Sequence, residues 1–113
     1  GYKGKQVRDI IHARDVVLAF EAVLASPRCG EVYNIGGGPG NSVSVLEAIE
    51  LASRVAGRTV RTAYSDVHRT GDHIWYVTNL AKLRAHYPSW RLTCEGVDGI
   101  AGDIAAAARR SVP

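Results

Sequence analysis

The stretch VYNIGGGPGNSVSVLEAIE, residues 32–50, constrains the fold most, because its character changes twice. An apolar, β-branched run at 32–35 leads into four glycines between 36 and 40, and a helical pattern follows. A short apolar run between turn residues predicts a buried strand. Ser44 and Glu47 have the spacing of a capping box at a helix start. The stretch therefore predicts a strand, a tight loop and a helix.

The glycine loop does not have the spacing of a nucleotide-binding loop. A dinucleotide loop follows G-x-G-x-x-G, and here its third glycine would fall on Asn41 or Val43. A P-loop needs a lysine after its last glycine, and this loop has none. Glycines can still bring backbone amides near a ligand at a helix N-terminus. We favour the alternative, an internal turn that needs positive φ angles and binds no cofactor.

The rest of the chain predicts one small α/β domain over residues 1–113. A β-rich run lies at 5–11, a short helix at 80–86 and a final helix at 94–110. Residues 15–25 predict an amphipathic helix, whose inward stripe is Val16, Ala19, Phe20, Val23 and Leu24. Residues 59–64 alternate like a strand, and Gly57 is placed to end the helix before them. Strands at 32–35 and 59–64 around that helix would form a βαβ unit.

Composition excludes several classes of protein. The net charge of +3 is small and its basic residues are scattered, so we expect no nucleic-acid partner. No apolar run approaches the roughly 20 residues that span a membrane, and no secretory signal opens the sequence. We therefore expect a cytoplasmic protein without a membrane partner. Cys29 and Cys94 lack the spacing of a metal motif, so we expect no metal site. Because Gly1 is not an initiator, we expect a piece of a longer protein.

Two arginines and an aspartate have the chemistry of a nucleotide site. The planar guanidinium fork of Arg8 or Arg69 matches a phosphate with two hydrogen bonds. Asp72 can accept a hydrogen bond from a ribose hydroxyl. Two arginines from separate segments can thus clamp a pyrophosphate. Taken alone, an arginine of this kind is more often a solvated surface charge than a ligand contact.

Three segments together resemble a known family. Residues 4–19 match G-x-x-x-R-D-[FYIW]-[IL]-[HY]-x-x-D-x-x-x-A, EVYNIGGG contains a VYNIG strand, and 69–72 read R-x-G-D. In this order they resemble the C-terminal, substrate-binding part of the extended short-chain dehydrogenase/reductases, the NAD-dependent nucleotide-sugar epimerases and dehydratases. Within this family, the sequences of these segments resemble those of CDP-sugar 2-epimerases most. The resemblance covers about residues 1–93.

The resemblance implies roles for individual residues. Arg8 and Arg69 would contact the substrate pyrophosphate, and Asp72 would bond the nucleotide ribose. His73 and Trp75 would line the sugar cleft, although Trp75 is equally consistent with a core aromatic. A nucleotide-diphosphate sugar, with a CDP-sugar expected, would be oxidised to a ketone by bound NAD. The NADH so formed would return the hydride to the opposite face, which inverts a ring carbon.

The resemblance covers no part of the family's N-terminal cofactor loop, and the family's Tyr-x-x-x-Lys pair is absent from this sequence. We therefore expect no catalytic residue and no cofactor site here, and an isolated chain without turnover. NAD would be bound by a missing N-terminal half. A stand-alone binding or interaction module derived from the fold is the alternative. Loss of one half would expose an apolar face, so we also expect a homodimer.

Three further residues of the first signature suggest structural roles. Asp9 is expected to pair with backbone or an arginine, and Asp15 to lie near a helix start, where a carboxylate is favoured. His12 is expected to be half-buried rather than a catalytic base. Tyr87, Pro88 and Trp90 would form a corner after the short helix.

Overall fold

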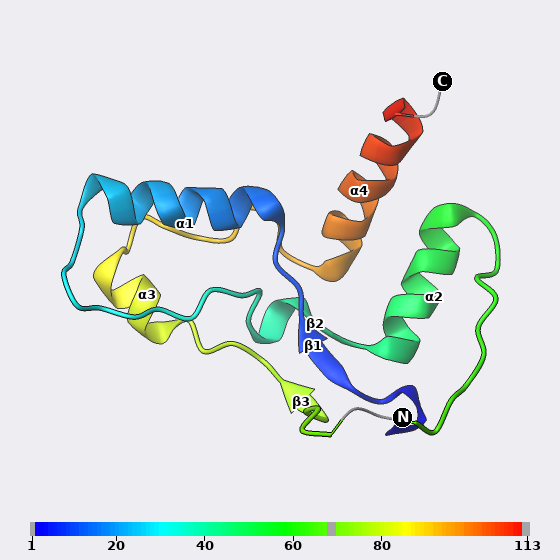
Figure 1. The fold of residues 1–113 in the computed structure, drawn as a ribbon. Helices are drawn as coiled ribbons and strands as arrows, with labels where there is room; N and C mark the ends of the chain where they lie inside the picture. The colour runs from blue at the N-terminus through cyan, green and yellow to red at the C-terminus, as the bar shows by residue number, and fades with distance from the viewer. Residues whose placement is uncertain (1, 68–69, 112–113) are drawn as a thin grey trace.

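A computed structural model describes residues 2–67 and 70–111 of the chain (Figure 1). Helices α1 and α3 lie together on one side of a small sheet, and α2 and α4 lie on the other (Figure 1). In chain order the elements are η1 (Tyr2–Gly4), β1 (Val7–Asp9), α1 (Ala13–Ala25), η2 (Pro39–Asn41), β2 (Ser42–Ser44), α2 (Val45–Ala56), β3 (Trp75–Tyr76), α3 (Ala81–His86) and α4 (Val97–Ser111).

The sheet is mixed and has three short strands in the order β2-β1-β3. Strand β1 pairs antiparallel with β2, so that Arg8 lies opposite Val43. It pairs parallel with β3, so that Val7 lies beside Trp75 and Arg8 beside Tyr76. The central strand therefore brings the start of the chain against a segment more than sixty positions away.

The main apolar core lies between α1, α3 and the corner that follows α3. Its buried members are Ala19, Leu80, Leu83, Tyr87 and Trp90. Polar atoms of the two aromatic residues are satisfied inside it, because the Tyr87 hydroxyl donates to the Ser26 carbonyl at 3.0 Å and the Trp90 indole to the Asp15 carbonyl at 3.0 Å. The predicted corner at 87–90 is confirmed as a core element.

The predicted inward stripe of α1 is wrong at two positions. Ala19 is fully buried, but Phe20 is 56% exposed and Leu24 is 79% exposed. The helix turns Ala19, Ala22 and Val23 toward the core cluster. Because successive residues are about 100° apart on a helix, Phe20 and Leu24 then face outward together with Val17. The apolar residues of α1 thus cover two faces rather than one.

Helix α2 begins and ends as its sequence predicts. The Ser44 hydroxyl accepts from the Glu47 amide at 3.3 Å, and the Glu47 carboxylate accepts from the Ser44 amide at 2.7 Å. Gly57 closes the helix in the left-handed conformation, with φ of 66°. Helix α2 packs against α4, where Leu51 and Ile100 are buried.

The predicted βαβ unit is wrong. Neither 32–35 nor 59–64 forms a strand within the described residues. A ladder needs a neighbouring backbone, and the carbonyl of Val32 instead accepts from the Lys82 ammonium at 3.0 Å. The amide of Val60 donates to the Ser53 hydroxyl at 3.0 Å. Both segments have the composition of a strand but pair with no other strand among the described residues. The chain is a small α/β domain with a three-stranded mixed sheet.

The fold is open for its size. Its radius of gyration is 16.5 Å, whereas a compact domain of this length has about 13 Å. The chain exposes 8183 Å², and a compact monomer of this mass exposes about 6,000 Å². The difference of roughly 2,000 Å² exceeds the about 800 Å² that each partner contributes to a standard protein interface. In the described part of the chain, no helix is long and apolar enough to cross a membrane.

Candidate functional site

The glycine loop packs against β1 and the residues after β3. A Cβ on Gly36 would collide with the Thr78 hydroxyl and lie 2.5 Å from the Asp9 carboxylate. A Cβ on Gly37 would collide with the Ile10 carbonyl. Gly38 has φ of 68°, a conformation that favours glycine. The interpretation as an internal turn is therefore confirmed, and close backbone approach at Gly36 and Gly37 is the stronger reason for the glycines.

Asp9 holds this loop in place, as a partner to backbone. One carboxylate oxygen accepts from the Gly38 amide at 2.8 Å and the Thr78 amide at 3.1 Å. Burial raises the pKa of Asp9, but the hydrogen bonds from Gly38 and Thr78 outweigh it, and the net pKa lies below the ordinary 3.8.

The described residues of the loop do not fit the pyrophosphate of NAD. Phosphate-binding loops offer free backbone amides, whereas the Gly38 amide is already bonded to the Asp9 carboxylate. That carboxylate would also repel a phosphate.

Arg8 and Asp72 meet at the end of the sheet. Nη2 of Arg8 donates to Oδ1 of Asp72 at 3.0 Å and to the His73 carbonyl at 2.6 Å. Nη1 donates to the Val7 carbonyl at 2.7 Å. The side chains of Arg8 and Asp72 are 37% and 19% exposed, so the pair is half-buried and open to solvent on one side. A cation and a carboxylate thus lie within the reach of a single nucleotide.

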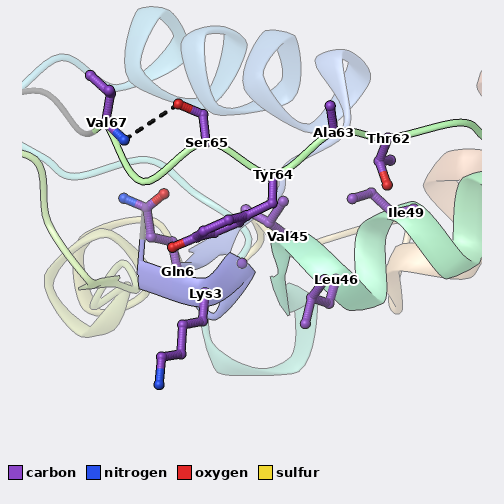
Figure 2. A pocket seen from close by; sticks show the side chains of 11 residues that line it. Lys3, Gln6, Val45, Leu46, Ile49, Thr62, Ala63, Tyr64, Ser65 and Val67 are labelled. Carbon is purple, nitrogen blue, oxygen red and sulfur yellow. Dashed lines mark hydrogen bonds between the residues drawn. The ribbon is translucent and has the colours of Figure 1, made fainter.

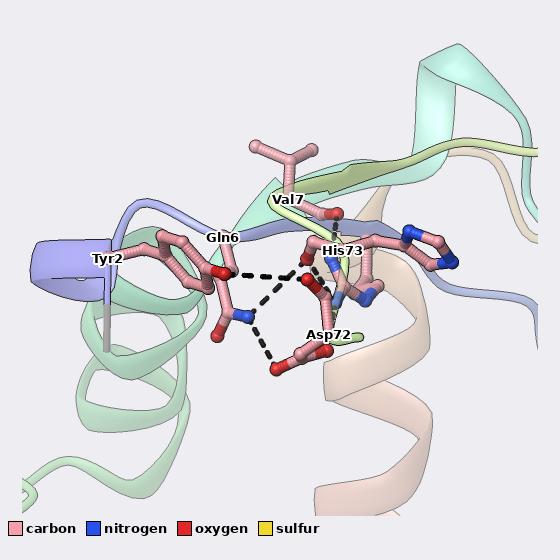
Figure 3. Close-up of polar contacts among 6 residues, drawn as sticks. Tyr2, Gln6, Val7, Asp72 and His73 are labelled. Atoms are coloured by element: carbon pink, nitrogen blue, oxygen red, sulfur yellow. Dashed lines mark hydrogen bonds and ion pairs between the residues drawn. The ribbon is translucent and has the colours of Figure 1, made fainter. Parts of the chain in front are cut away.

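Gln6 and Tyr2 complete this cluster. Nε2 of Gln6 donates to Oδ2 of Asp72 at 2.7 Å, and the Tyr2 hydroxyl donates to the Asp72 carbonyl at 3.5 Å. Figure 3 shows the side chains of Tyr2 and Gln6 converging on Asp72. Gln6 and Arg8 are two positions apart on an extended chain, so their side chains point to the same face. That spacing is the signal from which the sequence could have indicated Gln6.

The aromatic residues of β3 lie on different faces of the sheet. Trp75 is in register with Val7, and Tyr76 with Arg8, so Trp75 lies on the face opposite Arg8. Trp75 is 67% exposed and is not the core aromatic that its sequence allows. The His73 ring stacks on Tyr76 with centroids 6.1 Å apart. The structure therefore groups Arg8, Asp72, His73 and Tyr76 and leaves Trp75 apart from them.

Arg69, the second arginine of the expected clamp, lies outside the described residues. Among the described residues, no group of three histidine, cysteine, aspartate or glutamate side chains is arranged to hold a metal ion. Cys29 is exposed, Cys94 is half-buried, and both are free thiols.

Asp15 and His12 have structural roles. The Asp15 carboxylate is fully buried and accepts from the amide and hydroxyl of Thr93, at 3.0 and 2.5 Å. It thereby ties the first turn of α1 to the segment after the 87–90 corner. Nδ1 of His12 caps α1 by accepting from the Arg14 amide at 3.1 Å. Buried Asn41 forms a similar tie to the Cys94 carbonyl at 3.0 Å. Such long-range partners leave no local sequence signal.

A cavity of about 310 Å³ adjoins the cluster (Figure 2). Gln6 lines it and so lies between the cavity and Asp72. Apolar side chains of α2, Val45, Leu46 and Ile49, form one wall, and the segment 62–65 with the Tyr64 ring forms another.

Comparisons with known proteins find similarity to parts of longer enzymes. The model of the NAD dependent epimerase/dehydratase family matches residues 2–36. CDP-paratose 2-epimerase of Salmonella typhi is 32% identical over 99 residues, which are 86% of this chain and 29% of that protein.

Two solved structures share the fold. UDP-glucose 4-epimerase from Bifidobacterium longum, in complex with NAD+ and UDP, has a TM-score of 0.79 and 26% identity, over 95% of this chain and 31% of that chain. The dTDP-glucose 4,6-dehydratase from Bacillus anthracis, in complex with NAD, has a TM-score of 0.74 and 27% identity, over 96% of this chain and 33% of that chain. The chain therefore spans about a third of the length of these relatives.

Proposed function

We propose that this chain, which matches part of the NAD-dependent epimerase/dehydratase family in sequence and fold, is the substrate-binding lobe of a nucleotide-diphosphate-sugar epimerase. A CDP-sugar is the proposed substrate and epimerisation at carbon 2 the proposed reaction, as in CDP-tyvelose epimerase. The similarity to CDP-paratose 2-epimerase supports this choice of base and sugar.

The meeting of Arg8 and Asp72 at 3.0 Å carries the proposal. In the proposed site, the guanidinium binds the pyrophosphate and the carboxylate accepts from a ribose hydroxyl. His73 lies next to them and contributes to the sugar-facing wall. Arg69 is proposed as the second phosphate contact, three positions before Asp72 in the chain. Trp75 faces away from Arg8, so its proposed contact would be with a more distant part of the sugar.

NAD and the acid/base pair are proposed to belong to a separate N-terminal half. The Gly38 amide of the glycine loop is already bonded to the Asp9 carboxylate, and the sequence contains no Tyr-x-x-x-Lys pair. The task of this chain is then to hold and orient substrate against a cofactor bound elsewhere. We expect no turnover when the purified chain is mixed with CDP-sugar and NAD, and any turnover would contradict this division of roles.

Calorimetric titration with CDP, CDP-glucose and UDP-glucose tests the substrate class. Stronger binding of both cytidine compounds than of UDP-glucose is expected. Equal binding of all three would retain a nucleotide site but contradict the choice of base. No binding of any of them would contradict a nucleotide site in this chain.

A second candidate is a stand-alone interaction module, and the exposed stripe of α1 favours it. Val17, Phe20 and Leu24 are each more than half exposed on one side of that helix. Contiguous apolar patches mark interaction surfaces. The stripe would contact either the N-terminal half or a second copy in a homodimer. Binding of a nucleotide separates the two candidates, because an interaction module needs no such site.

A further inference from the structure

Gln6 bonds the oxygen of the Asp72 carboxylate that Arg8 does not bond. Its Nε2 donates to Oδ2 of Asp72 at 2.7 Å, while Arg8 donates to Oδ1 at 3.0 Å. The backbone of Gln6 is itself fixed, because its carbonyl accepts from the Val45 amide at the start of α2 at 3.0 Å. Gln6 therefore joins Asp72 to the start of α2.

The Nη2 donors with which Arg8 would bind a phosphate already have acceptors. The two protons of Nη2 are directed to Asp72 and to the His73 carbonyl. A guanidinium can bind a phosphate with two hydrogen bonds through either of two edges. Both of these edges include Nη2. Bidentate binding of a phosphate by Arg8 therefore requires it to release at least one of these two acceptors. Release of Asp72 would remove the hydrogen bond that Arg8 donates to its carboxylate.

We infer that Gln6 is a positioning residue for nucleotide binding, which keeps the Asp72 carboxylate in place when Arg8 turns to the phosphates. The inference rests on the proposed function, in which Asp72 accepts from the ribose. A neutral amide suits this role, because it bonds strongly to a carboxylate yet is drawn less to a phosphate than a cation is. Gln6 would thus support the ribose contact and leave the phosphate contact unaffected.

Two ligands separate these contacts. CDP carries both a ribose and a pyrophosphate, whereas inorganic pyrophosphate carries no ribose. We expect Gln6→Leu to weaken CDP binding about tenfold, the effect of one charge-assisted hydrogen bond, with pyrophosphate binding changed less than twofold. Gln6→Asn, which retains the amide but withdraws it by one methylene, should behave in the same way. Asn34→Leu removes an amide from an exposed position and serves as the matched control.

The outcomes are distinct. Selective loss of CDP binding in both Gln6 variants, with an unchanged thermal midpoint, supports the inference. Equal loss of both ligands, or no loss of either, overturns it and leaves the proposed function standing if the unaltered chain binds CDP. Failure of the unaltered chain to bind CDP overturns the proposed function, and the inference with it.

Discussion

Arg8 and Asp72 lie 64 positions apart in the chain and form an ion pair of 3.0 Å. The parallel pairing of β1 with β3 creates this contact, because it sets Val7 beside Trp75 and brings the residues before β3 alongside Arg8. The amide of Val7 also donates to the Ile74 carbonyl at 2.9 Å, which fixes the register at that end. The candidate site therefore depends on a short sheet whose geometry the glycine loop supports.

Gly37→Ala should destabilise the fold by about 3 kcal/mol, because overpacking against rigid backbone cannot be relieved by a rotamer change. The new Cβ would meet the Ile10 carbonyl and lie 2.7 Å from Cβ of Asn41. Gly40→Ala is the matched control, since nothing lies within 4 Å of its Cβ position. Urea unfolding measures both, and equal stabilities of the two variants would contradict the packing described for this loop.

Asp9→Ala should lower the free energy of unfolding by about 2–3 kcal/mol, because it leaves two buried amides without an acceptor. These are the amides of Gly38 and Thr78. Glu21→Ala, which removes an exposed carboxylate from α1, should change stability by less than about 0.5 kcal/mol. Similar unfolding midpoints for both variants in urea would show that Asp9 does not hold the loop.

The pKa of Asp9 predicts a loss of stability in acid. Folding lowers this pKa, so the carboxylate stabilises the fold at pH values above its ordinary 3.8. That contribution is lost as the pH falls through the lower pKa of the folded state. The free energy of unfolding should therefore decrease below about pH 4, and less steeply in Asp9→Asn than in the unaltered chain. Parallel pH profiles for the two proteins would contradict the assignment.

Phe20→Asp should reduce association through the outer face of α1 and leave folding nearly unchanged. Phe20 is 56% exposed, so its replacement opens no cavity in the core. Light scattering across a range of concentrations should show a smaller mass for this variant than for the unaltered chain. Glu21→Ala on the same helix lies outside the stripe and is the control. If the unaltered chain is monomeric throughout, α1 does not mediate self-association.

The sequence predicted those elements whose signals are local. The capping box of Ser44 and Glu47 and the left-handed Gly57 define α2 without any reference to the rest of the fold. The tight turn at 36–40 was also predictable. Its reason was not, because the atoms that exclude a Cβ belong to Asp9, Ile10 and Thr78 elsewhere in the chain.

Elements that need a distant partner were predicted less well. The composition of 32–35 and 59–64 indicates strands, yet a strand exists only where another backbone pairs with it. The apolar residues of α1 fit one stripe by period, but the position of α3 selects Ala19 and turns Phe20 outward. Likewise, the resemblance indicated Arg8 and Asp72. Gln6 had only its spacing from Arg8 as a sequence signal, and its contact with Asp72 depends on the meeting of two distant segments.

The central claim is that Arg8 and Asp72 form part of a nucleotide site. Calorimetric titration of CDP into Arg8→Ala and Arg54→Ala tests it most directly. Arg54 pairs with Asp98 at 2.8 Å on an exposed surface and controls for the loss of one positive charge. We expect Arg8→Ala to weaken CDP binding by about thirtyfold or more and Arg54→Ala to leave it within twofold of the unaltered chain. Equal CDP affinity in all three proteins would contradict the claim.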